Sequence, residues 1–204
     1  PMPINYDGGT TDIIFGAHDN RLYILNGDSG GYKPNWPQST VKPINSTAST
    51  ADVDGDGQLD IYVGSGTSDA GHCGGGGLYR FRIDGSIHAY MPPYDGSPAC
   101  ISGVQSSPVL GDITNDAQPD ITFGTLGLRA QSITTSGSSN SGWPIYGDDT
   151  QFATPALADV NGDGVTDVIM GGDSSPGAPV DFRGGMVRAI SGDGVILWEY
   201  RIDE

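Results

Sequence analysis

Two nine-residue stretches carry acidic or amide side chains at their first, third, fifth and ninth positions. They read DVDGDGQLD at 52–60 and DVNGDGVTD at 159–167. Like charges this close repel one another, so a folded loop needs a compensating cation to hold them together. Calcium takes six to eight oxygen ligands at about 2.3–2.6 Å, and carboxylate, amide and carbonyl oxygens at this spacing can wrap it. The two stretches therefore predict two Ca²⁺ sites.

The expected ligands follow from the positions within each stretch. In the first site they are the side chains of Asp52, Asp54, Asp56 and Asp60 and the carbonyl of Gln58, and in the second the side chains of Asp159, Asn161, Asp163 and Asp167 and the carbonyl of Val165. Gly57 and Gly164, at the sixth position, permit the positive φ that turns the chain around an ion. Neither stretch contains Cys or His, which argues against zinc. The alternative without metal is a hairpin rich in Asx-turns.

A third copy of the stretch, DITNDAQPD at 112–120, departs from the pattern. Its candidate ligands are Asp112, Thr114, Asp116, Asp120 and the carbonyl of Gln118. Thr114 removes one charge, and Ala117 places a Cβ where the turn favours glycine. These departures predict that any calcium site here is weaker than the other two. A partial copy at 8–18 keeps only the final aspartate, Asp12, and is predicted to bind no metal.

The elements that must position these loops repeat along the chain. The final aspartates, at 12, 60, 120 and 167, are 48, 60 and 47 residues apart. Each is the first residue of a strand-like run, namely DIIFG, DIYVG, DITFG or DVIMG. No window shows a sustained helical period. Each unit is therefore predicted to be a four-stranded antiparallel meander, and radially packed meanders form an all-β propeller. The approximate blades are 1–43, 44–99, 100–147 and 148–204, in a single, partial propeller domain over 1–204.

These repeats resemble FG-GAP, or VCBS-type, repeats, the blades of integrin-α-like β-propellers. The stretches at 52–64 and 159–171 match the family's acidic signature and the strand that follows it, and Phe15-Gly16 and Phe123-Gly124 match its Phe-Gly pair. The resemblance implies that calcium has a structural role. It also implies seven or eight blades in the whole propeller, so we expect the chain to be a fragment or to assemble with other copies.

The charge of the chain excludes some partners. The 204 residues carry 9 Lys and Arg against 25 Asp and Glu, a formal net charge of −16. Nucleic-acid binding depends on Lys and Arg contacts to phosphate, so no nucleic-acid partner is expected. No apolar run approaches the roughly 18 residues of a membrane-spanning helix, so no membrane insertion is expected.

Cys73 and Cys100 are the only cysteines. Two cysteines do not diagnose a compartment, and two buried thiols remain an alternative. In the predicted blades, Cys73 falls in a loop between strands two and three, and Cys100 in the following connection between blades. These loops lie on the same face of adjacent blades. Because calcium sites of this kind imply millimolar external calcium, we predict a disulfide and an extracellular, secreted or cell-surface location.

Trp36, Trp143 and Trp198 recur near the fourth strand of three units. A repeated position favours packing between blades over a platform that stacks on carbohydrate.

Two functions remain open. The first is a non-catalytic, calcium-stabilised extracellular module for binding, adhesion or surface assembly, with a glycan or protein as its ligand and further blades or neighbouring chains as its partners. The second is the propeller of a secreted polysaccharide lyase or glycosidase, which would need paired carboxylates on the face opposite the calcium loops. The candidates there are Asp69, Asp95, Asp148, Asp149, Asp173 and Asp181. Nothing selects a pair, so the non-catalytic module is favoured.

Overall fold

The computed structural model describes residues 1–67, 75–92, 103–147, 149–174 and 184–203, and the strands in these ranges form four antiparallel sheets of four strands each. The first sheet contains β1 (Met2–Ile4), β2 (Asp12–Ala17), β3 (Arg21–Leu25) and β4 (Gln38–Ser39). The second contains β5 (Ser49–Ala51), β6 (Asp60–Gly66), β7 (Gly76–Arg82) and β8 (Ile87–Met91). The third contains β9 (Val109–Gly111), β10 (Asp120–Gly124), β11 (Arg129–Ile133) and β12 (Ile145–Tyr146). The fourth contains β13 (Ala156–Ala158), β14 (Asp167–Ser174), β15 (Gly184–Ile190) and β16 (Ile196–Asp203).

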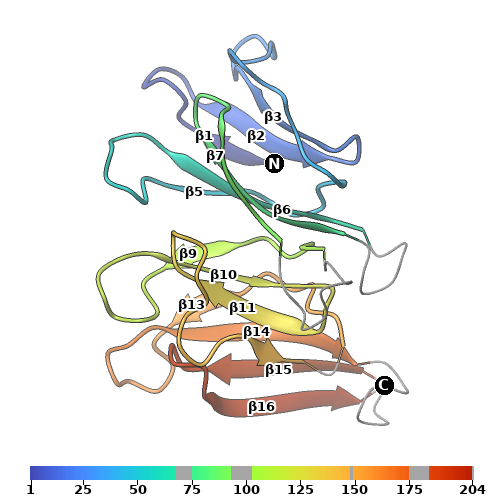
Figure 1. Ribbon diagram of the computed structural model, residues 1–204, viewed down its shortest axis with the longest axis vertical. Coiled ribbons are helices and arrows are strands. Elements are labelled where there is room, and N and C mark those ends of the chain that lie inside the picture. The colour runs from blue at the N-terminus through green and yellow to red at the C-terminus, as the bar shows by residue number, and fades with distance from the viewer. Residues whose placement is uncertain (68–74, 93–102, 148, 175–183, 204) are drawn as a thin grey trace.

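The sheets are arranged as the blades of an open propeller. In each sheet the strand order follows the chain, and every neighbouring pair is antiparallel. Figure 1 shows the four sheets one above another in chain order, from the blue first sheet to the red fourth. The predicted all-β fold of four-stranded meanders is confirmed, and the described part of the chain contains no helix. The four sheets do not close into a ring, as expected of a partial propeller.

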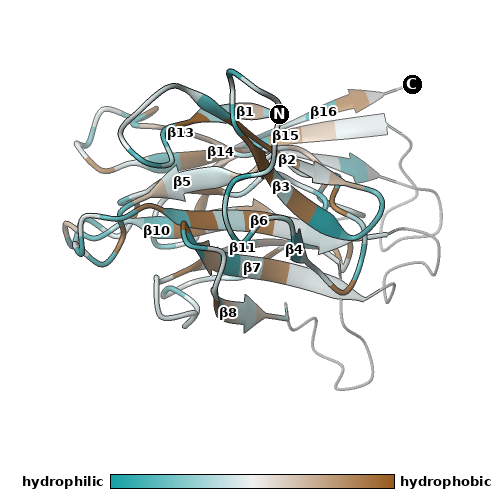
Figure 2. Cartoon of the chain, turned by 90° about the horizontal axis from the view of Figure 1, so that it is seen from above, coloured by the Kyte–Doolittle hydropathy of each residue, from teal (hydrophilic) through white to brown (hydrophobic). Residues whose placement is uncertain are grey.

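The blades pack through alternating side chains, as the two-residue period of a strand dictates. In β6, Ile61 and Val63 pack with the first blade, whereas Tyr62 between them packs with the third. Figure 2 shows hydrophobic residues interrupted by hydrophilic ones along the strands. Because both faces of an inner blade are covered, β6 and β10 are buried along their whole length. The residues that follow the acidic loops of the two inner blades are therefore buried.

The hydrophobic core consists of three clusters, each lying between successive blades. The first joins Ile14, Leu22 and Trp36 to Ile61, Val63 and Phe81; the second joins Tyr62 and Leu78 to Ile121 and Phe123; the third joins Ala130 and Trp143 to Val168 and Met170.

Two of the three tryptophans join successive blades, as predicted. The indole of Trp36 donates a hydrogen bond to the carbonyl of Ile83 in the second blade, and Trp143 donates to Gly192 in the fourth. Both precede the last strand of their blade and begin a cis Trp-Pro peptide. The prediction that Trp198 occupies the matching place is wrong. It lies inside β16, in register with Ala189, and is 45% exposed.

The two ends of the array expose apolar side chains. On the fourth blade, the side chains that point away from the third blade include Trp198, Tyr200 and Ile202, of which Tyr200 is 66% exposed. On the first blade, Ile13 points away from the second and is 42% exposed. A partial propeller with such end faces implies further blades or a partner chain that covers them.

Candidate metal centre

The three acidic stretches fold into one loop conformation between the first and second strands of their blades. In each loop the first carboxylate accepts backbone hydrogen bonds from the chain that turns around it. Gly57 N lies 2.9 Å from Asp52, Ala117 N 2.8 Å from Asp112, and Gly164 N 2.9 Å from Asp159. The fifth carboxylate in turn accepts from the seventh backbone amide, at 2.8 Å in all three loops. The loops lie on the same side of the array, on the left in Figure 1.

The sixth position has the positive φ that the sequence predicts. Gly57 has a φ of 83°, and Gly164 has a φ of 84°. Ala117, their counterpart in the third loop, adopts a φ of 67° despite its Cβ. An L-residue in this region costs roughly 1–2 kcal/mol, so the third loop keeps the shape of the other two at an energetic penalty.

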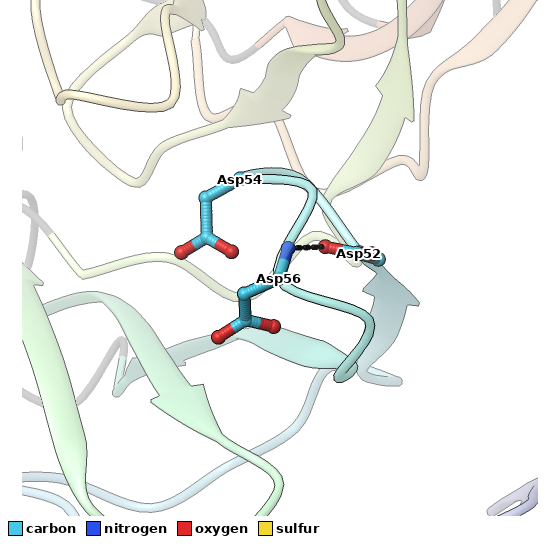
Figure 3. A group of neighbouring side chains, drawn as sticks. All are labelled: Asp52, Asp54 and Asp56. Atoms are coloured by element: carbon cyan, nitrogen blue, oxygen red, sulfur yellow. Dashed lines mark hydrogen bonds between the residues drawn. The ribbon is translucent and has the colours of Figure 1, made fainter.

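Three carboxylates converge in the second-blade loop. Single oxygens of Asp52, Asp54 and Asp56 lie within 4.8 Å of one another. Figure 3 shows the carboxylates of Asp54 and Asp56 side by side, while an oxygen of Asp52 accepts a hydrogen bond from the backbone of Asp56. All three are exposed. Hard oxygen ligands this close together fit a calcium ion rather than a softer metal.

The ninth carboxylate is buried in every blade, and in the second blade it forms an ion pair. The guanidinium of Arg80, on β7, contacts Asp60 through two nitrogens, at 2.9 and 2.7 Å. One of these nitrogens also lies 2.8 Å from Asp54. Burial opposes the charge of Arg80, but the hydrogen bond to Asp60 and the nearby charges of Asp60 and Asp54 together outweigh it and raise the pKa of Arg80. The structure therefore places a permanent cation between two predicted metal ligands.

The ninth carboxylate of the fourth blade lacks such a partner. Asp167 is fully buried, and its Oδ2 accepts a hydrogen bond from Val160 N at 3.0 Å. Its Oδ1 is buried and has no hydrogen-bond partner in the described part of the chain. Asp163 and Asp167 both line a cleft of about 460 Å³ beside the loop. A buried carboxylate oxygen without a partner is costly, and a bound cation would remove that cost.

The third and first blades place other polar groups beside their ninth carboxylates. Asp120 accepts hydrogen bonds from the hydroxyl of Thr114 at 3.0 Å and from the amide of Asn140 at 2.9 Å. Asp12 lies 3.0 Å from Nζ of Lys33, which also contacts Asp7 at 2.8 Å. The hydrogen bond to Asp7 raises the pKa of Lys33, which keeps the amine charged.

Sequence reasoning did not identify Lys33, Arg80 or Asn140 as part of these sites. Lys33 and Asn140 each stand three residues before the tryptophan of a Trp-Pro pair, in KPNWP and NSGWP. That shared offset is a signal that the sequence contains. Arg80 has no such signal, because its place depends on the pairing of β6 with β7.

The loop oxygens fit calcium in charge and chemistry. Hydrogen bonds from the backbone of Gly164 and Gly162 lower the pKa of Asp159, so this exposed carboxylate stays ionised to a lower pH than usual. The carbonyls of Gln58 and Val165 and the side chain of Asn161 remain predicted ligands.

Other predicted residues lie outside the described ranges. These are Cys73 and Cys100 with their proposed bridge, and the candidate carboxylates Asp69, Asp95, Asp148 and Asp181. Of the remaining candidates, Asp149 accepts a hydrogen bond from the backbone of Thr150 at 2.7 Å, and Asp173 lies at an exposed position of β14. The described residues include no helix long and apolar enough to cross a membrane.

Comparison with known protein families gives one match. Residues 7–63, from the first acidic region through the 52–60 loop into β6, match the FG-GAP-like repeat. No curated protein matches the chain.

Two solved structures have a similar arrangement at low identity. The V. cholerae biofilm matrix protein Bap1 is 16% identical with a TM-score of 0.49, over 94% of this chain and 36% of Bap1. BamB from Moraxella catarrhalis is 12% identical with a TM-score of 0.47, over 95% of this chain and 62% of BamB. The chain thus spans less than two thirds of either protein. Residues 7–63 are thus similar to the FG-GAP-like repeat, and they lie within an open array of four four-stranded blades.

Proposed function

We propose that this chain is a non-catalytic propeller module whose acidic loops bind calcium, and that the ion holds the loops in shape for binding, adhesion or surface assembly outside the cell. The loops at 52–60 and 159–167 are the two proposed sites. The role of the ion is structural, since the loop that it holds joins the end of one strand to the start of the next.

The buried Oδ1 of Asp167, without a partner among the described residues, carries the proposal. In the other three blades a Lys, Arg or Asn nitrogen lies within 3.0 Å of the ninth carboxylate. The fourth blade keeps the same loop and the same buried carboxylate but shows no such donor in the described ranges. A divalent cation in this loop would neutralise Asp167 together with Asp163, which lines the same cleft.

The end faces support a role in assembly. Trp198, Tyr200 and Ile202 form an exposed apolar surface on the fourth blade, and the equivalent faces of inner blades are covered by the next blade. We propose that a further blade, from this protein or from a neighbouring chain, covers this surface. Exposed all-oxygen loops favour weak calcium affinity of the extracellular kind, about 10⁻⁴–10⁻³ M, and this supports the proposal of a location outside the cell.

Thermal unfolding tests the calcium site. The protein is stripped of metal with a chelator, the loss of metal is verified by elemental analysis, and melting is then recorded with added CaCl₂ or MgCl₂. A ligand that binds only the folded state stabilises it by about 2.7 kcal/mol at a hundredfold excess over Kd. Calcium should raise the melting temperature more than magnesium, which gives up its bound waters reluctantly. An identical melting curve in chelator and in excess calcium would contradict the proposal.

A further inference from the structure

The second and fourth blades have matched backbones around their acidic loops. In both, β-strands three and four are joined by a tight turn, closed by Gly85 N to Arg82 O at 2.9 Å and by Gly194 N to Ser191 O at 2.8 Å. Both also have a register shift at the same place in strand three, at Arg80/Phe81 and at Ala189/Ile190. The first and third blades instead use the longer connection that contains the Trp-Pro pair.

One residue in strand three distinguishes the two matched blades. Arg80 lies opposite Tyr62, two residues after Asp60, and Ala189 lies opposite Ile169, two residues after Asp167. Arg80 and Ala189 therefore occupy the same position relative to the ninth carboxylate. At this position the second blade has a guanidinium that contacts the carboxylate, and the fourth blade has a methyl group that cannot.

Arg80 is held where it is. Only 5% of the residue is exposed, and its guanidinium stands 5.9 Å from the ring centroid of Tyr62. Burial raises the pKa of Tyr62 to about 12, so this ring stays neutral beside the cation. A metal ion ligated by Asp54 and Asp60 would have to displace the guanidinium from both carboxylates or bind beside a positive charge.

We infer that Arg80 is a built-in cation that competes with calcium for the second-blade loop, so that calcium fills the fourth-blade loop first and the second-blade loop with lower affinity. This inference rests on the proposed calcium-binding function. The number of carboxylates does not explain this order of affinity, since the second loop has four carboxylates and the fourth has three. By carboxylate count alone, the second loop would bind calcium more tightly.

Calcium titration of the second-blade loop tests the inference. The substitution Asp167→Asn removes the fourth-blade site, and isothermal titration calorimetry then measures calcium affinity with and without Arg80→Gln. We expect Arg80→Gln to tighten binding about tenfold or more, because a charge in direct contact shifts ionic equilibria by one to three powers of ten. Arg82→Gln is the matched control. Arg82 is 41% exposed and 3.9 Å from Asp54, so its loss should change affinity far less.

The reciprocal substitution covers the case in which Arg80→Gln does not fold. Ala189→Arg in the otherwise unchanged chain should weaken calcium binding at the fourth-blade loop about tenfold or more, by the same contact effect. Ala189→Met, a long side chain without charge, controls for the disturbance of packing at this buried site.

The outcomes separate the inference from the proposed function. Unchanged or weaker affinity in folded Arg80→Gln, or equal affinities for Ala189→Arg and Ala189→Met, would overturn the role of Arg80 while leaving calcium binding intact. An absence of calcium binding in the parent protein and all variants would overturn the proposed function and the inference with it.

Discussion

The second and fourth blades have the same acidic loop, the same tight turn and the same register shift, yet they balance their charge differently. Asp60 is paired with Arg80, whereas Oδ1 of Asp167 is buried without a hydrogen-bond partner in the described part of the chain. The difference arises from one strand position, occupied by Arg80 in one blade and Ala189 in the other. A matching motif therefore does not imply a matching need for metal, because a neighbouring strand can provide the positive charge.

The first and third blades extend this comparison. They reach the ninth carboxylate with Lys33 and Asn140, both from the connection between strands three and four. The group beside the buried ninth carboxylate thus differs between the blades: an amine, a guanidinium, an amide and, in our proposal, a calcium ion. A buried ion pair need not add net stability, but the removal of one partner leaves a buried charge without compensation.

The largest expected effect is that of Asp60→Asn. It leaves the guanidinium of Arg80 buried with a weaker partner, and the loss of one member of a buried pair typically costs about 3–5 kcal/mol. The loss should already be present in chelator, because Arg80 is charged whether or not calcium is bound. Denaturant unfolding in both conditions measures it. A loss that appears only in calcium would show that Asp60 serves the metal and not Arg80.

Asp167→Asn should behave in the opposite way. In chelator it removes a buried charge whose Oδ1 has no partner in the described structure, so the free energy of unfolding should not fall. In calcium at a hundredfold excess over Kd, the variant should lack the gain of about 2.7 kcal/mol that the parent protein receives. The same unfolding experiment, paired with ion counting by native mass spectrometry, should show one ion fewer. A large loss of stability in chelator would remove the contrast between the blades.

A smaller loss of stability is expected from tryptophan substitution, and it should differ between a covered and an uncovered blade face. Trp36→Phe removes the hydrogen bond to Ile83 O, which is 3.1 Å long and buried. Leaving that carbonyl without a donor should cost about 1–3 kcal/mol. Trp198→Phe, at a residue that is 45% exposed, is the control and should fall within about 0.5 kcal/mol. Equal losses would mean that the outer face of the fourth blade is as constrained as the inner faces.

The smallest effect concerns the third loop. Ala117→Gly should stabilise the protein by about 1 kcal/mol, because it relieves the cost of a left-handed conformation at a Cβ-bearing residue. Gly57→Ala is the reverse change. A Cβ on Gly57 would meet no atom within 4 Å, so its effect should come from the backbone alone. If both variants have the stability of the parent protein, the positive φ at this position has no energetic consequence.

Much of the architecture could be predicted because its signals are local. The runs DIIFG, DIYVG, DITFG and DVIMG begin the second strand of each blade, and the loops before them turn at Gly57 and Gly164 as their sequence indicates. Trp198 was misplaced for the opposite reason. Like Trp36 and Trp143 it lies near the fourth strand of its unit, but a tight turn replaces the long connection in the fourth blade, so the residue falls inside β16.

The sequence by itself determined the loops, since alternating carboxylates and glycines specify a local turn whose hydrogen bonds span only a few residues. It also determined the strands, since β-branched and apolar runs fold as local units. Only the tertiary structure decided how each buried carboxylate is neutralised. Arg80 is 20 residues from Asp60, and Asn140 is 20 residues from Asp120. Strand register and the path of a connection bring these groups together, and neither can be read from the acidic motif because both depend on how whole strands pair.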